Sequence, residues 1–140
     1  MDKIFFEFDF RITLEQTDAV GIIHNSVVFR IMEVAELEGL RAYNVHWLQF
    51  DKLFFPRTNV SAKFLKALRF DDKVKLLVKV LRVRAAKVIL RHEFYNESGE
   101  LAILGEVEFT SVSRDGFTPQ MLPNEMHTVL KQFENKRKVV

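Results

Sequence analysis

The chain has 140 residues, of which 48% are hydrophobic and 29% are charged, and its formal net charge is +2. This length and composition predict one globular domain, residues 1–140, with a sizeable core. The small net charge argues against a nucleic-acid-binding protein, which carries a strong basic surface. Because the chain has no cysteine, disulfides, thiolate metal sites and a cysteine nucleophile are excluded.

The sequence indicates a protein that is neither inserted in a membrane nor secreted. No stretch of about 18 uncharged apolar residues occurs, so we expect no membrane span. The N-terminal segment MDKIFFEFDF has acids among its apolar residues, unlike the continuous apolar run of a secretion signal. We therefore expect a cytoplasmic location.

The first elements in chain order are a strand and a long helix. Residues 4–14 alternate and predict a strand, which ends before Gly21. Residues 27–43 predict a helix, with Asn25 or Ser26 as the N-cap. Apolar residues cover most of this helix and leave a narrow polar stripe, so we expect it to be buried within the domain. The stripe consists of Ser26, Arg30, Glu33, Glu36, Glu38 and Arg41.

The remainder of the chain is strand-like. Strands are predicted at residues 60–64, 74–83, 88–95 and 101–109, with turns at Asp71–Asp72 and 96–99. The apolar phase slips near Leu81, which indicates a bulge. Pro123–Asn124 begins a short last helix, and residues 136–140 read as a solvated tail. Because the turns are short, the strands should pair antiparallel. The fold class is α+β, with one antiparallel sheet wrapped around a long central helix.

The stretch TDAVGIIHN, residues 17–25, resembles a motif of acyl-CoA thioesterases of the 4-hydroxybenzoyl-CoA thioesterase type. The motif has an Asp, two variable residues, a Gly and two apolar residues, followed by a polar pair that leads into the helix. Asp18, Gly21 and the pair His24–Asn25 match it, and the segment FLKALRFDDKV, residues 64–74, is similar to a second segment of the family. The resemblance implies the hotdog fold and hydrolysis of a CoA thioester without a cofactor. It also implies a homodimer or homotetramer with active sites between subunits.

By its position alone, Asp18 is either an ordinary turn acid near a helix start or a reactive acid. The resemblance assigns a role to it and to Asn25. Asp18 would be the base or the nucleophile, and the backbone N–H of Asn25 would be the oxyanion donor. A helix start suits that role because its first N–H groups lack intrahelical partners and its dipole favours negative charge. Gly21 lets the intervening chain turn tightly. The sequence leaves open whether Asp18 attacks the carbonyl directly or activates water.

Other polar residues have two interpretations each. His24 is either a second acid or base or a substrate contact, since imidazole titrates near neutral pH, or it is a hydrogen-bonded residue at the helix start. Glu33 is either an alternative base on the helix or a member of the polar stripe paired with Arg30. The four histidines lack the spacing of metal ligands, so we expect no metal site.

The substrate is less well defined by the sequence. Val27 and Val28 stand where many members of the family carry an Asn–Tyr pair, and with Gly21 they are predicted to contact the substrate. The fourteen Phe residues, with Trp47 and Leu48, favour an aromatic or a medium to long apolar acyl group.

A cluster of basic residues offers contacts for CoA. Arg82, Arg84 and Lys87 are candidates for binding the CoA phosphates, because Arg can grip phosphate through two hydrogen bonds. Basic residues that point outward from strands also protect sheet edges, which is the alternative. Two further functions remain open: an acyl-carrier-protein thioesterase, and a non-catalytic protein that binds acyl-CoA.

Overall fold

The structure is a computed structural model that describes residues 2–136. Its strands are β1 (Phe6–Arg11), β2 (Leu53–Phe54), β3 (Arg57–Phe64), β4 (Lys73–Val83), β5 (Lys87–Tyr95), β6 (Leu101–Thr110) and β7 (Val112–Ser113). Its helices are α1 (Asn25–Arg41) and α2 (Asn124–Gln132), and its short 3-10 helices are η1 (Leu14–Gln16) and η2 (Trp47–Gln49).

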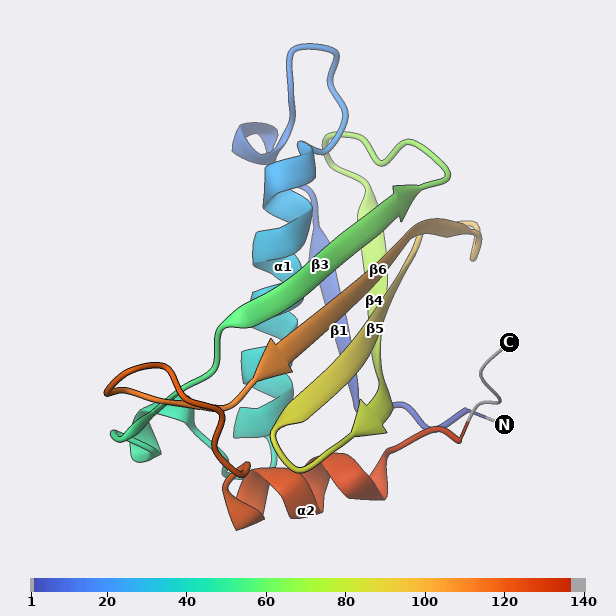
Figure 1. The fold of residues 1–140 in the computed structure, drawn as a ribbon. Helices are drawn as coiled ribbons and strands as arrows, with labels where there is room; N and C mark the ends of the chain where they lie inside the picture. Colours follow the sequence, from blue (N-terminus) through green and yellow to red (C-terminus); the bar gives the residue numbers. More distant parts are fainter. Residues whose placement is uncertain (1, 137–140) are drawn as a thin grey trace.

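Five strands form one antiparallel sheet in the order β1-β4-β5-β6-β3. The sheet curves around α1, and α2 lies at the end of the sheet where β4 turns into β5 (Figure 1). The expected architecture, an antiparallel sheet around a long helix, is therefore confirmed. Strands β2 and β7 pair separately, and this small sheet was not predicted because each of its strands has only two residues.

Local details of the sheet follow the sequence pattern. The pairing of β4 with β5 shifts register between Val80 and Arg82, so the predicted bulge is confirmed. The predicted turns are also present, with φ of 70° at Asp71 and 76° at Gly99. Strand β3 begins at Arg57, three residues before the predicted start. The tail predicted at 136–140 lies outside the described residues except for Lys136.

The predicted helix was displaced along the chain. Helix α1 spans Asn25–Arg41 rather than 27–43, and its N-cap is His24 rather than Asn25 or Ser26. The backbone of His24 is extended, and its Nδ1 accepts a hydrogen bond from the N–H of Ser26 at 3.1 Å. An imidazole can therefore cap a helix in the way that a short polar side chain does.

The expectation that α1 is wholly buried was wrong for a single chain. One face packs on the sheet so closely that a Cβ on Gly105 of β6 would overlap the terminal methyl of Met32. On the other side Phe29 and Val34 keep 36% and 45% of their surface exposed. Glu36, assigned to the polar stripe, is instead buried.

Neither helix within residues 2–136 is long and apolar enough to cross a membrane.

Candidate active site

Asp18 begins a tight turn before α1. The N–H of Gly21 donates to the carbonyl of Asp18 at 3.0 Å, and Gly21 has a φ of 83°, which an L-residue rarely adopts. The side chain of Asp18 closes the same turn, because its Oδ1 accepts from the N–H of Val20 at 2.9 Å and of Ile22 at 3.3 Å. Two backbone groups thus fix the orientation of the carboxylate.

The second carboxylate oxygen of Asp18, Oδ2, takes no part in the turn. Among the described residues none donates a hydrogen bond to Oδ2, and the side chain is half-buried. A turn acid and a reactive acid were alternatives at the level of sequence. In the structure the two roles are compatible, because they use different oxygens.

The start of α1 presents one free donor beside this turn. The N–H of Ser26 is taken by His24, and the N–H of Val27 donates to the carbonyl of His24 at 3.0 Å. No described residue accepts from the N–H of Asn25. This amide lies at the positive end of the helix dipole, so it is suited to a developing negative charge.

Asp18, His24 and Asn25 line one cavity of about 520 Å³. Its other walls are Ile22, Ile23, residues 64–68 and Ile103. The structure therefore brings together the three residues that the sequence assigned to catalysis. The apolar wall from 64–68 was not predicted as part of the site, although the segment FLKALRFDDKV carried the signal.

His24 has a structural role in this arrangement. Its Nδ1 accepts from the N–H of Ser26 and also lies 2.8 Å from the hydroxyl of Ser26. An Nδ1 that accepts from a backbone amide leaves the ring proton on Nε2 of the neutral form. The imidazole lines the cavity while it holds the helix start in place.

The predicted substrate contacts are distributed differently. Gly21 shapes the turn but does not line the cavity. Val28 has no exposed surface and packs in the core on the sheet-facing side of α1, and Val27 is half-buried against the core. Neither valine lines the cavity, so the structure does not place them against a substrate there.

The residues predicted to bind the CoA phosphates lie far from the Asp18 cavity in the fold. Arg82, Arg84 and Lys87 belong to the hairpin between β4 and β5, beside α2, whereas the start of α1 is at the opposite end of the sheet (Figure 1). Within one chain they are not brought together with Asp18. Lys66 lines the Asp18 cavity instead, and its Nζ lies 2.9 Å from Oε2 of Glu100.

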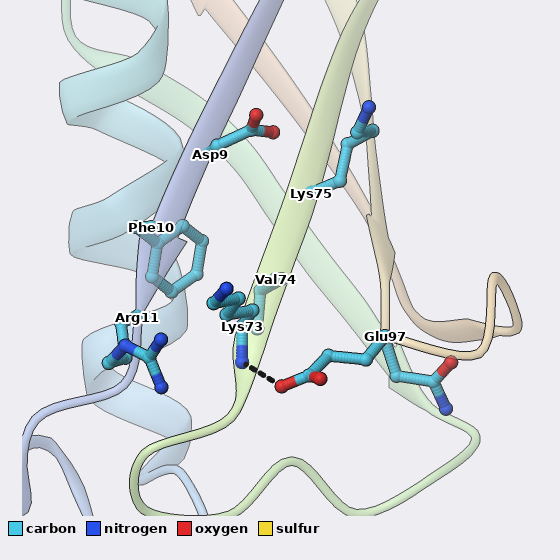
Figure 2. A pocket seen from close by; sticks show the side chains of 8 residues that line it. Asp9, Phe10, Arg11, Lys73, Val74, Lys75 and Glu97 are labelled. Atoms are coloured by element: carbon cyan, nitrogen blue, oxygen red, sulfur yellow. Dashed lines mark hydrogen bonds between the residues drawn. The ribbon is translucent and has the colours of Figure 1, made fainter.

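A second cavity, of about 550 Å³, lies between β1, the start of β4 and the turn after β5. Figure 2 shows Asp9, Lys73 and Glu97 at its walls, with the backbone N–H of Lys73 donating to Glu97 at 3.1 Å. Its Arg11 is paired with Asp71 at 3.3 Å. None of the residues predicted for catalysis lines this cavity, so the Asp18 cavity is the better candidate.

The core contains a charged cluster that the sequence did not indicate. Glu36 of α1 bonds to Arg57 of β3, and its Oε2 lies 3.0 Å from Nε2 of His92 on β5. This second contact does not have the geometry of a hydrogen bond. Glu33 approaches Arg57 at 3.8 Å, rather than pairing with Arg30, and remains half-exposed.

Within residues 2–136 no three His, Asp or Glu side chains are grouped in a way that could hold a metal ion.

Comparison with known proteins identifies the family. The profile described as "Thioesterase superfamily" matches residues 20–103, which is more than half of the chain. The chain belongs to the thioesterase superfamily. This confirms the resemblance seen in the motif before α1 and, at the level of the family, the expectation of an enzyme that hydrolyses thioesters.

Relatives and solved structures agree with this assignment. The chain is similar to "Acyl-CoA thioester hydrolase YbgC" of Escherichia coli O6:H1, with 22% identity over 134 residues that cover 94% of this chain and all of that protein. A DHNA-CoA thioesterase structure from Staphylococcus aureus has a TM-score of 0.84 at 22% identity, covering 91% of this chain and 89% of the other. Slr0204, a 1,4-dihydroxy-2-naphthoyl-CoA thioesterase from Synechocystis, has a TM-score of 0.86 at 14% identity, covering 94% and 98%. The structural likenesses confirm the hotdog fold.

Proposed function

We propose that the protein hydrolyses an acyl-CoA thioester in the cavity between Asp18 and the start of α1. One observation carries the proposal: Asp18 has one oxygen fixed by backbone donors and one oxygen free, in the same cavity as the unpaired N–H of Asn25. Relatives named as acyl-CoA hydrolases support CoA as the carrier.

In the reaction the free Oδ2 of Asp18 acts on the thioester carbonyl. As a general base it takes a proton from water while the water oxygen bonds to the carbonyl carbon. The N–H of Asn25, which is already oriented by the helix, donates a hydrogen bond to the carbonyl oxygen as negative charge develops on it. The C–S bond then breaks, and the thiolate of CoA receives the proton that Asp18 holds. The products are the free acid and CoA.

Direct attack by Asp18 uses the same oxygen and is the alternative. Oδ2 would then bond to the carbonyl carbon, CoA would leave, and water would open the resulting anhydride. A single turnover in isotopically labelled water distinguishes the routes. Label in Asp18 establishes direct attack, with water opening the anhydride at the carbon of Asp18. Label in the released acid alone arises from general-base catalysis or from water attack on the acyl carbon of the anhydride, and trapping of the anhydride with hydroxylamine separates these two.

The walls of the cavity favour an apolar acyl group. Ile22, Phe64 and Ile103 line it, and its cationic residue Lys66 is already paired with Glu100. We therefore propose an aromatic or medium to long apolar acyl group. The test is release of free thiol from a panel of short, long and aromatic acyl-CoAs by the wild type and by Asp18→Asn.

The substitution Asp18→Asn tests the chemical role of Asp18 separately from its structural role, because it keeps the turn. The amide oxygen of Asn can still accept from Val20 and Ile22, but it cannot accept a proton. We expect loss of about a hundredfold or more in kcat with an unchanged unfolding midpoint. Equal turnover by wild type and variant overturns the role of Asp18. If the wild type binds acyl-CoA saturably but does not turn it over, the protein is a non-catalytic acyl-CoA-binding protein. If the wild type turns over only acyl-carrier-protein thioesters, the carrier is the acyl-carrier protein rather than CoA.

We also propose that the protein is a homodimer formed through β3. This strand of eight residues is at the edge of the sheet, so one row of its backbone groups has no partner strand. Val60 and Phe64 on the helix-facing side are 39% and 51% exposed, next to the exposed Phe29 of α1. Proteins usually cover an unpaired apolar edge strand of this length, because its free backbone groups can pair with a strand of another chain.

A further inference from the structure

The turn that carries Asp18 is held by the segment that connects β3 to β4, and both lie at the same end of the sheet (Figure 1). Ile22, at the end of the turn, forms an antiparallel bridge with Arg69 of this segment. The N–H of Ile23 donates to the carbonyl of Leu68 at 2.7 Å. The turn is therefore attached to the fold on one side by the backbone of the connection between β3 and β4.

Ile22 links this segment to the carboxylate of Asp18. The N–H of Ile22 donates to Oδ1 of Asp18 at 3.3 Å, and the carbonyl of Ile22 accepts from the N–H of Asp18 at 2.8 Å. Because Arg69 is bridged to Ile22, a displacement of Arg69 displaces the residue that orients the carboxylate.

Residues 68–72, which we call the supporting loop, are themselves fixed to the fold at both ends. At the first end Leu68 is buried in the core. At the other end the N–H of Asp71 donates to the carbonyl of Ile12 at 2.8 Å, and the N–H of Ile12 donates to the carbonyl of Asp72 at 3.0 Å. Ile12 directly follows β1 and is also buried. The supporting loop therefore connects the turn before α1 to the sheet.

The side chain of Asp72 fixes the bend of the supporting loop. Its Oδ2 accepts from the N–H of Arg69 at 2.8 Å, and the N–H of Asp72 donates back to the carbonyl of Arg69 at 3.1 Å. Between them Asp71 has a φ of 70°, which few residues with a side chain adopt. Among the described residues, the N–H of Arg69 is the one hydrogen-bond donor to the carboxylate of Asp72. A short acidic side chain that bonds to the backbone in this way holds such a bend in one conformation.

We propose that Asp72 is a positioning residue for the hydrolysis at Asp18, an inference that rests on the proposed function. The carboxylate of Asp72 holds Arg69 in place. Arg69 is bridged to Ile22, which orients Oδ1 of Asp18, and the orientation of Oδ2 follows from that of Oδ1. Asp72 does not line the Asp18 cavity, so it acts through the backbone and not on the substrate. A catalytic group misplaced by about 1 Å can cost about a hundredfold in rate, so one hydrogen bond in a loop can control kcat.

The first test compares two substitutions at Asp72, with hexanoyl-CoA or benzoyl-CoA as the substrate, whichever the wild type hydrolyses faster. Asp72→Ala removes the acceptor for the N–H of Arg69, whereas Asp72→Asn keeps an acceptor and removes only the charge. We expect kcat to fall about tenfold for Asp72→Ala with KM unchanged within about twofold, and kcat to stay within about twofold of wild type for Asp72→Asn.

Asp9→Ala is the matched control, since Asp9 is exposed on β1 and does not line the Asp18 cavity. We expect the kcat of this variant to equal that of the wild type. Asp72→Asn as slow as Asp72→Ala, or an equal loss in the control, would overturn the proposal. A rise in KM with an unchanged kcat for Asp72→Ala would also overturn it, because the supporting loop would then shape the cavity wall and not the acid.

A double-mutant cycle with Asp18→Asn separates positioning from a general loss of structure. If Asp72 acts through Asp18, Asp72→Ala should change the residual kcat of Asp18→Asn by less than about twofold, because the group that it positions is already gone. The same tenfold loss in both backgrounds, about tenfold each time, contradicts the proposal. Unfolding midpoints are measured on the same samples, and if Asp72→Ala does not fold, Asp72→Ser replaces it, since a hydroxyl bonds to the backbone more weakly. A wild type that turns over no thioester, or Asp18→Asn as active as the wild type, rejects the proposed function instead.

Discussion

The Nε2 atom of His92 lies 3.0 Å from Oε2 of Glu36, in a core where these two side chains have only 0% and 2% exposure. The same glutamate bonds to Arg57, whose guanidinium lies 4.5 Å from the centre of the Trp47 ring. The cluster links α1 to β5 and β3, so it joins the helix whose first N–H is the proposed oxyanion donor to the strand at the sheet edge.

Glu36→Ala should destabilise the protein by about 3–5 kcal/mol, because it leaves Arg57 without its buried counter-charge. Glu38→Ala is the matched control on the same helix. Glu38 pairs with Arg41 at 2.7 Å on the surface, and loss of such a pair costs less than about 1 kcal/mol. Urea denaturation measures both values, and equal effects would contradict the buried role of Glu36.

Gly105→Val should cost about 3 kcal/mol through overpacking. A side chain at this position of β6 would overlap the terminal methyl of Met32, whose side chain has no exposed surface and would have to shift within the core. The free energy of unfolding again measures the effect. Gly99→Val, in an exposed turn with no atom within 4 Å of the new Cβ, controls for the chemical change, although its φ of 76° adds strain of its own.

His24→Asn distinguishes a capping residue from an acid or base. Asn can accept from the N–H of Ser26 as His24 does, so the helix start and kcat should be retained within a few-fold, whereas His24→Ala should lose about 1 kcal/mol of stability. A loss of about a hundredfold in kcat for Asn would instead show that the imidazole transfers a proton. Steady-state kinetics and thermal unfolding are measured on the same samples.

Val60→Glu should dissociate the proposed dimer, because it places a charge on the helix-facing side of β3, where that dimer brings two copies together. We expect at least a tenfold increase in the dimer dissociation constant, together with loss of activity at low protein concentration. Ile4→Glu is the control, since Ile4 is 42% exposed and precedes β1 at the opposite edge of the sheet. Light scattering across a dilution series checks both, and a wild type that is monomeric at all concentrations would refute the interface.

Glu134 gives a pH-dependent contribution to stability. Burial raises the pKa of its carboxyl, but hydrogen bonds from Lys131 and from the N–H of Val83 outweigh burial and hold the pKa below its usual 4.5. A lowered pKa in the folded state contributes stability above the ordinary pKa, and this contribution is lost as the pH falls below it. Glu134→Gln should therefore lower the free energy of unfolding by about 1–2 kcal/mol at pH 7. The difference in this free energy between variant and wild type should shrink below about pH 4.5. A constant difference across this range would contradict the assignment.

The sequence predicted the elements whose pattern is local. The strands β4 to β6 follow from alternation and short turns, and Asp18 and Asn25 follow from a motif nine residues long. Glu36 and Arg57 could not be predicted as a buried pair, because they are far apart in the chain and each is a typical surface residue by itself. Val28 lies in the core although its neighbours His24 and Asn25 line the candidate cavity, because the rotation of the helix turns its side chain inward.

In the proposed mechanism the carboxylate of Asp18 both closes a turn and reacts with the substrate, and this couples the order of a loop to chemistry. Whenever the turn opens, Oδ1 loses its two amide donors, and the orientation of Oδ2 is lost with them. If Asp18 acts as proposed, heating should abolish turnover at a temperature below that at which the sheet unfolds. The enzyme would then regain full activity on cooling, because only a local segment has melted.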